Sequence, residues 1–83
     1  MSLFLAVPQA PRADIAKAWS VADVNQFFRQ RDAAGVAAVF ERNAVNGEDF
    51  LAFSSADALE RDLRLTPFAA RKVMRLRVEF LAG

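Results

Sequence analysis

At 83 residues the chain is long enough for one small domain, and its 54% hydrophobic and 25% charged residues are typical of a folded protein. It contains no cysteine and no histidine, which excludes disulfides, thiolate metal sites and every catalytic group that uses imidazole. The longest apolar run is far shorter than the ~20 residues that span a bilayer, so an intracellular location, cytoplasmic or nuclear, is expected.

Residues 1–17 differ from the rest of the chain. Pro8 and Pro11 exclude a continuous helix there. The same stretch holds an apolar cluster of Leu3, Phe4, Leu5 and Val7. It is interpreted as an extended arm that ends in a short turn near residues 14–17. The arm is either a strap over the domain's own core or a docking peptide for another domain.

The first helix is predicted to begin at Ser20, because Ser20 and Asp23 have the spacing of a capping box. The apolar residues of this helix recur at the spacing of one buried face: Val21, Val24, Phe27 and Phe28. It is expected to end around residues 31–34. Trp19, just before it, is assigned to the core.

Gly35 is taken as the break before a second short helix, which buries Val36, Val39 and Phe40 and ends near Asn43. Asn46-Gly47 predicts a turn in which glycine takes a positive φ. A short third helix then carries Phe50, Leu51 and Phe53.

Ser54 and Asp57 form a second predicted capping box, which opens a fourth helix that runs to about Asp62. Thr66-Pro67 is a strong start signal for a long last helix that ends near Leu81. No segment has the pattern of a strand. The expected fold is all-α: a compact bundle of four short helices and one long C-terminal helix, over residues 18–82.

Acidic and basic residues are segregated along the second half of the chain. The acidic set consists of Glu48, Asp49, Asp57, Glu60 and Asp62. One base, Arg61, lies between these residues in the sequence. The basic set follows without any acid between its members: Arg64, Arg71, Lys72, Arg75 and Arg77. A surface divided in this way favours association, with a second copy or with two different partners, over catalysis.

The order and spacing of several motifs resemble those of a sterile alpha motif (SAM) domain, from about Trp19 to Leu81. The matching segments are Trp19-Ser20-Val21-Ala22-Asp23-Val24, Phe27-Phe28, Phe40, Val45-x-Gly47, Phe50-Leu51, Phe53-Ser54, Leu59-x-x-Asp62-Leu63-x-Leu65-Thr66 and Arg71-Lys72-Val73-Met74. The chain departs from the family pattern at two positions near the start of the last helix. The family often has glycine at the position of Arg64, and often has another glycine within the segment that is Phe68-Ala69-Ala70 here.

The resemblance implies a five-helix fold and a protein–protein interaction module that associates head to tail with itself or with another SAM domain, in scaffolding or signalling. It implies an acidic mid-domain surface made of Glu48, Asp49, Asp57, Glu60 and Asp62. The matching end-helix surface, at the start of the last helix, would be made of Thr66, Phe68, Arg71, Lys72 and Arg75. Homopolymer and heteromer are both compatible with the sequence.

Phe68 is either the apolar anchor of that contact or a residue that packs on its own domain across the helix start. The basic residues are either partner-binding or a solvated face partly paired with the domain's own acids. One branch of the family binds RNA hairpins through the basic start of the last helix, which makes RNA binding the alternative function.

No catalytic residue, metal site, cofactor or small-molecule substrate is expected. Glu48-Asp49 is the one adjacent acid pair, and adjacent helical residues do not face each other. The chain is therefore not expected to be an enzyme.

Overall fold

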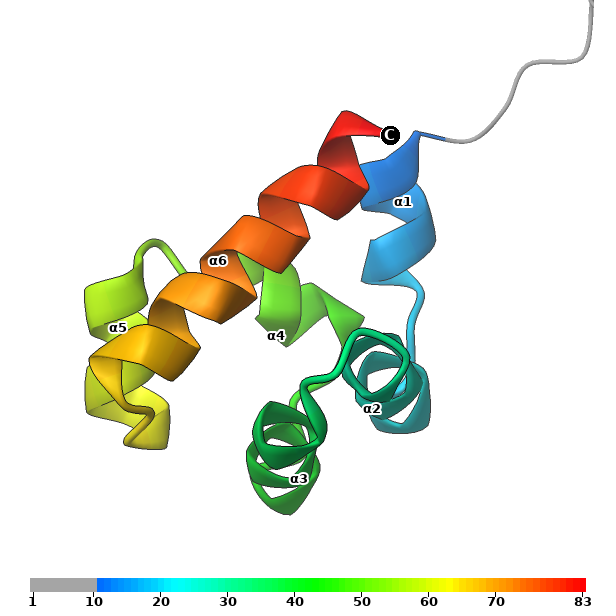
Figure 1. The fold of residues 1–83 in the computed structure, drawn as a ribbon. Helices are drawn as coiled ribbons and strands as arrows, with labels where there is room; N and C mark the ends of the chain where they lie inside the picture. The colour runs from blue at the N-terminus through cyan, green and yellow to red at the C-terminus, as the bar shows by residue number, and fades with distance from the viewer. Residues whose placement is uncertain (1–10) are drawn as a thin grey trace, which may run out of the picture.

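Six helices, and no strand, make up residues 11–83, which are the residues that the computed structural model describes (Figure 1). They are α1 (Arg12–Lys17), α2 (Val21–Arg29), α3 (Ala34–Arg42), α4 (Gly47–Ala52), α5 (Ala56–Leu63) and α6 (Pro67–Ala82). The expected all-α class and the long last helix are confirmed. Residues 18–82 hold the expected four short helices and one long one, α2–α6, and the sixth helix, α1, lies in the segment predicted to be an arm.

Helix α1 replaces the short turn that was expected near residues 14–17. Pro11 stands just before its first residue, so the ring interrupts no helical hydrogen bond. The helix packs against α4 and α6, and Ala16 on its inner face is fully buried. The second half of the predicted arm is therefore part of the packed structure. The apolar cluster at residues 3–7 lies outside the described residues.

The Ser20 capping box at the start of α2 is confirmed. The Asp23 amide donates to Ser20 Oγ over 3.1 Å, and the Ser20 amide donates to Asp23 Oδ2 over 3.0 Å. The helix ends at Arg29, two residues earlier than expected. The chain then reverses through Asp32, which has a left-handed φ of 58°.

Two of the roles predicted for glycine differ in the structure. Gly35 lies inside α3, which already begins at Ala34. Gly47 has no positive φ; it is the first residue of α4, and Ala44 takes the left-handed conformation instead, with φ 55°. Asn46 caps α4 by accepting from the Asp49 amide over 2.9 Å. The predicted turn at 46–47 is therefore a helix start.

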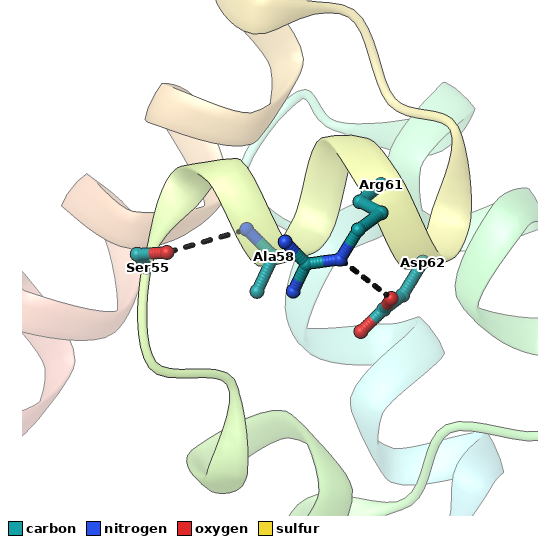
Figure 2. Close-up of polar contacts among 4 residues, drawn as sticks. All are labelled: Ser55, Ala58, Arg61 and Asp62. Atoms are coloured by element: carbon teal, nitrogen blue, oxygen red, sulfur yellow. Dashed lines mark hydrogen bonds and ion pairs between the residues drawn. The ribbon is translucent and has the colours of Figure 1, made fainter.

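Helix α5 is capped by Ser55 and not by Ser54. Ser55 Oγ accepts a hydrogen bond from the Ala58 amide over 3.2 Å (Figure 2). The predicted box was thus placed one residue too early, because two consecutive serines offer the same cap. Helix α6 begins as predicted, with Thr66 as its cap and Pro67 as its first residue.

Aromatic rings from four helices and the α1–α2 connection form the centre of the core. Phe28, Phe40 and Phe50 are almost fully buried and contact one another edge to face, with centroids 4.9–6.3 Å apart. Trp19 is half-buried and packs against this cluster, with its ring 4.9 Å from Phe80 on α6 and 5.1 Å from Phe27 on α2. The aromatic cluster thereby ties the last helix to the first half of the chain.

Candidate functional site: the start of helix α6

The start of α6 is held by its own cap and by two buried neighbours. Thr66 Oγ1 accepts from the Ala69 amide over 3.1 Å. Leu65 before the cap and Ala70 after it are both buried in the core. Pro67 and Phe68 lie between these fixed points, so the first turn of the helix presents them outward.

Phe68 is 73% exposed, the largest exposed fraction of any large apolar side chain in residues 11–83. An aromatic ring that packed across the helix start of its own domain would be mostly covered. The structure therefore excludes that alternative and leaves the ring free for a contact outside the domain.

Shallow hollows flank Phe68 on two sides. A hollow of about 330 Å³ is basic and is lined by Phe68, Arg71, Lys72 and Arg75. A second hollow of about 370 Å³ lies between α3 and the α5–α6 connection. Its lining is mostly apolar, with Ala33, Val36, Val39, Leu65 and Ala69, and also includes the charged residues Asp32, Arg64 and Lys72. The exposed ring thus stands between a cationic and an apolar surface.

The five bases that follow one another in the sequence do not share one role. Arg71 and Arg75 are exposed and lie one turn apart. Lys72 is half-buried, and its Nζ donates to the Asp32 carbonyl oxygen over 2.8 Å. Thr66, Phe68, Arg71, Lys72 and Arg75, the predicted end-helix surface, are thus gathered on α6 and its cap.

Arg77 is half-buried and contacts the end of α4. One of its terminal nitrogens donates to the carbonyl oxygens of Phe50, Leu51 and Phe53, at 3.1, 3.3 and 2.8 Å. These carbonyls end α4 and have no partner within that helix. Burial lowers the pKa of Arg77 from its ordinary value. The sequence assigned Arg77 to the basic set of α6. No local pattern could have predicted its hydrogen bonds, because their acceptors lie 24–27 residues earlier in the chain.

The predicted acidic residues lie on two helices. Glu48 and Asp49 are exposed in the first turn of α4, where Asp49 also completes the cap with the Asn46 amide at 3.4 Å. Asp57, Glu60 and Asp62 lie on α5, which packs against α6. Asp57 and Asp62 are exposed, and Glu60 is half-buried.

Within residues 11–83 a single ion pair is present, Arg61 Nε to Asp62 Oδ1 at 3.5 Å (Figure 2). Both side chains are more than half exposed, and such pairs contribute about 0 to 1 kcal/mol. The acidic set and the bases of α6 form no ion pair with each other in this part of the chain. The bases of α6 are therefore not paired with the domain's own acids in residues 11–83, and the exposed Arg71 and Arg75 remain compatible with a solvated basic face.

The described residues contain no group of three or more carboxylate side chains placed to hold a metal ion. None of the helices in residues 11–83 has both the length and the hydropathy that crossing a membrane requires. Comparison of the chain with family models, with curated proteins and with solved structures gave no match.

Proposed function

We propose that the chain is a SAM-type protein-interaction module whose end-helix surface, Thr66, Phe68, Arg71, Lys72 and Arg75, binds an acidic surface of a second protein molecule. The observation that carries the proposal is the exposure of Phe68, 73%, between a basic and an apolar hollow. The partner surface is either the acidic mid-domain surface of a second copy (Glu48, Asp49, Asp57, Glu60 and Asp62) or its counterpart in another SAM domain.

The energies assign different roles to the ring and to the charges. Burying a phenylalanine side chain contributes about 1.5–3 kcal/mol, and aromatic residues are frequent at interface hot spots. Exposed ion pairs contribute about 0–1 kcal/mol each, so Arg71 and Arg75 would steer the approach and set its orientation. The N-terminal dipole of α6 favours carboxylates at the same place.

A contact between two different surfaces of one chain is heterologous. Unless its rotation closes a ring, it joins copies into an open helical chain. If only one of the two surfaces is able to bind, the same kind of contact joins this chain to a different SAM domain. Either arrangement serves scaffolding.

Sedimentation velocity over a wide concentration range, at low and high salt, tests self-association. We expect species that grow with concentration and shrink with salt. Phe68→Ala, Arg71→Glu and Asp57→Arg should each reduce association at least about tenfold without loss of helicity, since all three side chains are exposed. Mixing the Arg71→Glu and Asp57→Arg chains should restore one contact per pair and give a heterodimer.

Lys17→Glu and Glu79→Arg are the matched controls, because they make the same charge changes on exposed residues away from the start of α6. Equal association of the wild-type chain, the three variants and the controls would show that the proposed surfaces are wrong. A wild-type chain that is monomeric at every concentration leaves a different SAM domain as the partner.

RNA-hairpin binding, the alternative function, has weaker support from the geometry. Lys72 and Arg77 already donate to backbone carbonyls, which leaves Arg71 and Arg75 as the exposed bases on this part of α6. A fluorescence anisotropy titration with an RNA hairpin separates the two functions. Binding that falls steeply with salt and with Arg71→Glu, in a chain that does not self-associate, would favour RNA.

A further inference from the structure

The hollow of about 370 Å³ beside Phe68, called the apolar hollow from here on, is lined by two residues with a strained backbone. Asp32 and Arg64 both have a left-handed φ of 58°. This conformation is unfavourable for a residue with a β-carbon, although an aspartate tolerates it better than an arginine. Ala44 is the one other non-glycine residue with a positive φ in residues 11–83, and it does not line the hollow. Backbone strain of this kind is typical of binding sites.

Gly35 leaves the α3 edge of the apolar hollow free. It lines the hollow and lies inside α3, where glycine is less favourable than alanine. Its φ is not positive, and a β-carbon there would meet no atom within 4 Å. Neither the backbone nor the packing of this chain therefore requires a glycine at residue 35. A larger side chain would begin in open space at the edge of the hollow.

The walls of the apolar hollow are suited to an aliphatic side chain. Val36, Val39 and Leu65 line it together with two alanines. No buried side-chain nitrogen or oxygen atom in residues 11–83 lacks a hydrogen-bond partner. The walls therefore leave no buried polar side-chain atom free to bind the edge of a nucleotide base, and covering them removes apolar surface from water.

The charged residues around the apolar hollow favour a carboxylate beside that side chain. They are two bases, Arg64 and Lys72, and one acid, Asp32. Arg64 is exposed and forms no ion pair within residues 11–83, and Lys72 donates to the backbone carbonyl of Asp32. The same bases disfavour a symmetric dimer in which each copy inserts Phe68 into the hollow of the other, because like charges would then face each other.

We propose that the apolar hollow receives an aliphatic side chain of about the size of leucine from an acidic protein partner. A carboxylate of the same partner segment then lies at Arg64, and the Phe68 ring forms one wall of the contact. The proposal rests on the protein-interaction function proposed above. It specifies what the start of α6 recognises: an aliphatic residue next to an aspartate or a glutamate.

Methyl NMR of the full chain with small probes tests the hollow without a partner protein. N-acetyl-leucine joins an aliphatic side chain to a carboxylate, N-acetyl-alanine keeps the carboxylate, and N-acetyl-leucine methylamide keeps the side chain. We expect N-acetyl-leucine to shift the methyl signals of Val36, Val39 and Leu65, with at least about threefold higher affinity than either control compound. The signals of Val78 and Leu81, in the last part of α6, should stay in place.

Equal binding of the three compounds, or no shift at these methyls, would overturn the proposal. Tighter binding of adenosine monophosphate than of N-acetyl-leucine at the same methyls would assign the hollow to a nucleotide and would overturn it as well. The probe titration decides the proposal whether or not the chain self-associates.

Gly35→Leu separates this proposal from the proposed function, because it fills the hollow and leaves Phe68 and every charge in place. It should abolish the shifts caused by N-acetyl-leucine and reduce self-association at least about tenfold, without loss of helicity. Ala38→Leu, at an exposed position of α3 outside the lining, is the matched control and should do neither. In a self-associating chain, loss of association with Phe68→Ala but not with Gly35→Leu would overturn the hollow and keep the proposed function. Probe binding that is lost with Gly35→Leu, with association unchanged by both variants, would reject the proposed function and keep the hollow as a binding site.

Discussion

The carbonyl of Ala16, at the end of α1, lies directly against the α-carbon of Gly47, at the start of α4. A β-carbon at residue 47 would overlap the Ala16 carbonyl oxygen and stand 2.9 Å from the β-carbon of Trp19. The Gly47 amide also donates to the Trp19 carbonyl over 2.9 Å. The missing side chain of Gly47 is thus what allows the α1–α2 segment to pack on α4.

Gly47→Ala is expected to destabilise the fold by about 1–3 kcal/mol, because backbone atoms must move to admit the methyl group. Urea unfolding followed by circular dichroism measures this. Gly35→Ala is the matched control: its β-carbon would meet nothing within 4 Å and it lies inside α3, so it should be neutral or stabilise by about 0.5–1 kcal/mol. Equal effects of the two substitutions would contradict the close contact with Ala16.

Ser55→Ala is expected to cost about 0.5–2 kcal/mol of stability, since it leaves the Ala58 amide without its cap. Ser54→Ala is the control and should change stability by less than about 0.5 kcal/mol. Thermal unfolding of the two variants decides which serine caps α5. A larger loss for Ser54 would restore the assignment made from the sequence.

Arg77→Met should destabilise the protein by about 1.5–3 kcal/mol. The substitution keeps most of the apolar stem and removes the charged donor from the carbonyls of Phe50, Leu51 and Phe53. Arg75→Met makes the same charge change at an exposed position and should stay within about 0.5 kcal/mol of the wild type. Chemical denaturation of the two variants at one ionic strength measures the difference. Similar unfolding curves for Arg77→Met and Arg75→Met would mean that Arg77 does not stabilise the end of α4.

Arg64→Gly is expected to stabilise the fold by about 0.5–1 kcal/mol. Arg64 ends α5 with φ 58° and ψ 35°, a left-handed conformation that costs a residue with a β-carbon about 1–2 kcal/mol. Ala38→Gly, at an exposed position inside α3, is the control and should lose about 0.5–1 kcal/mol in the same unfolding experiment. A loss at both positions would contradict strain at Arg64.

Most helix starts and the all-α class can be predicted from local patterns in the sequence. Caps such as Ser20 with Asp23 and Thr66 before Pro67 act over three residues, and apolar spacing acts over one or two turns, so both are visible locally. Helix α1 was not predicted, because it has six residues, no side-chain cap and one buried residue. Isolated helices of that length are unstable. Its conformation depends on packing against α4 and α6.

The sequence also supplied the ten residues of the candidate surfaces, but the tertiary structure decided what each can do. Packing left Phe68 73% exposed, engaged Lys72 and Arg77 with distant backbone carbonyls, and brought the Ala16 carbonyl against Gly47. Each of these contacts joins residues more than twenty positions apart. Such pairs form only when helices pack, so no local pattern of charge or hydropathy could reveal them.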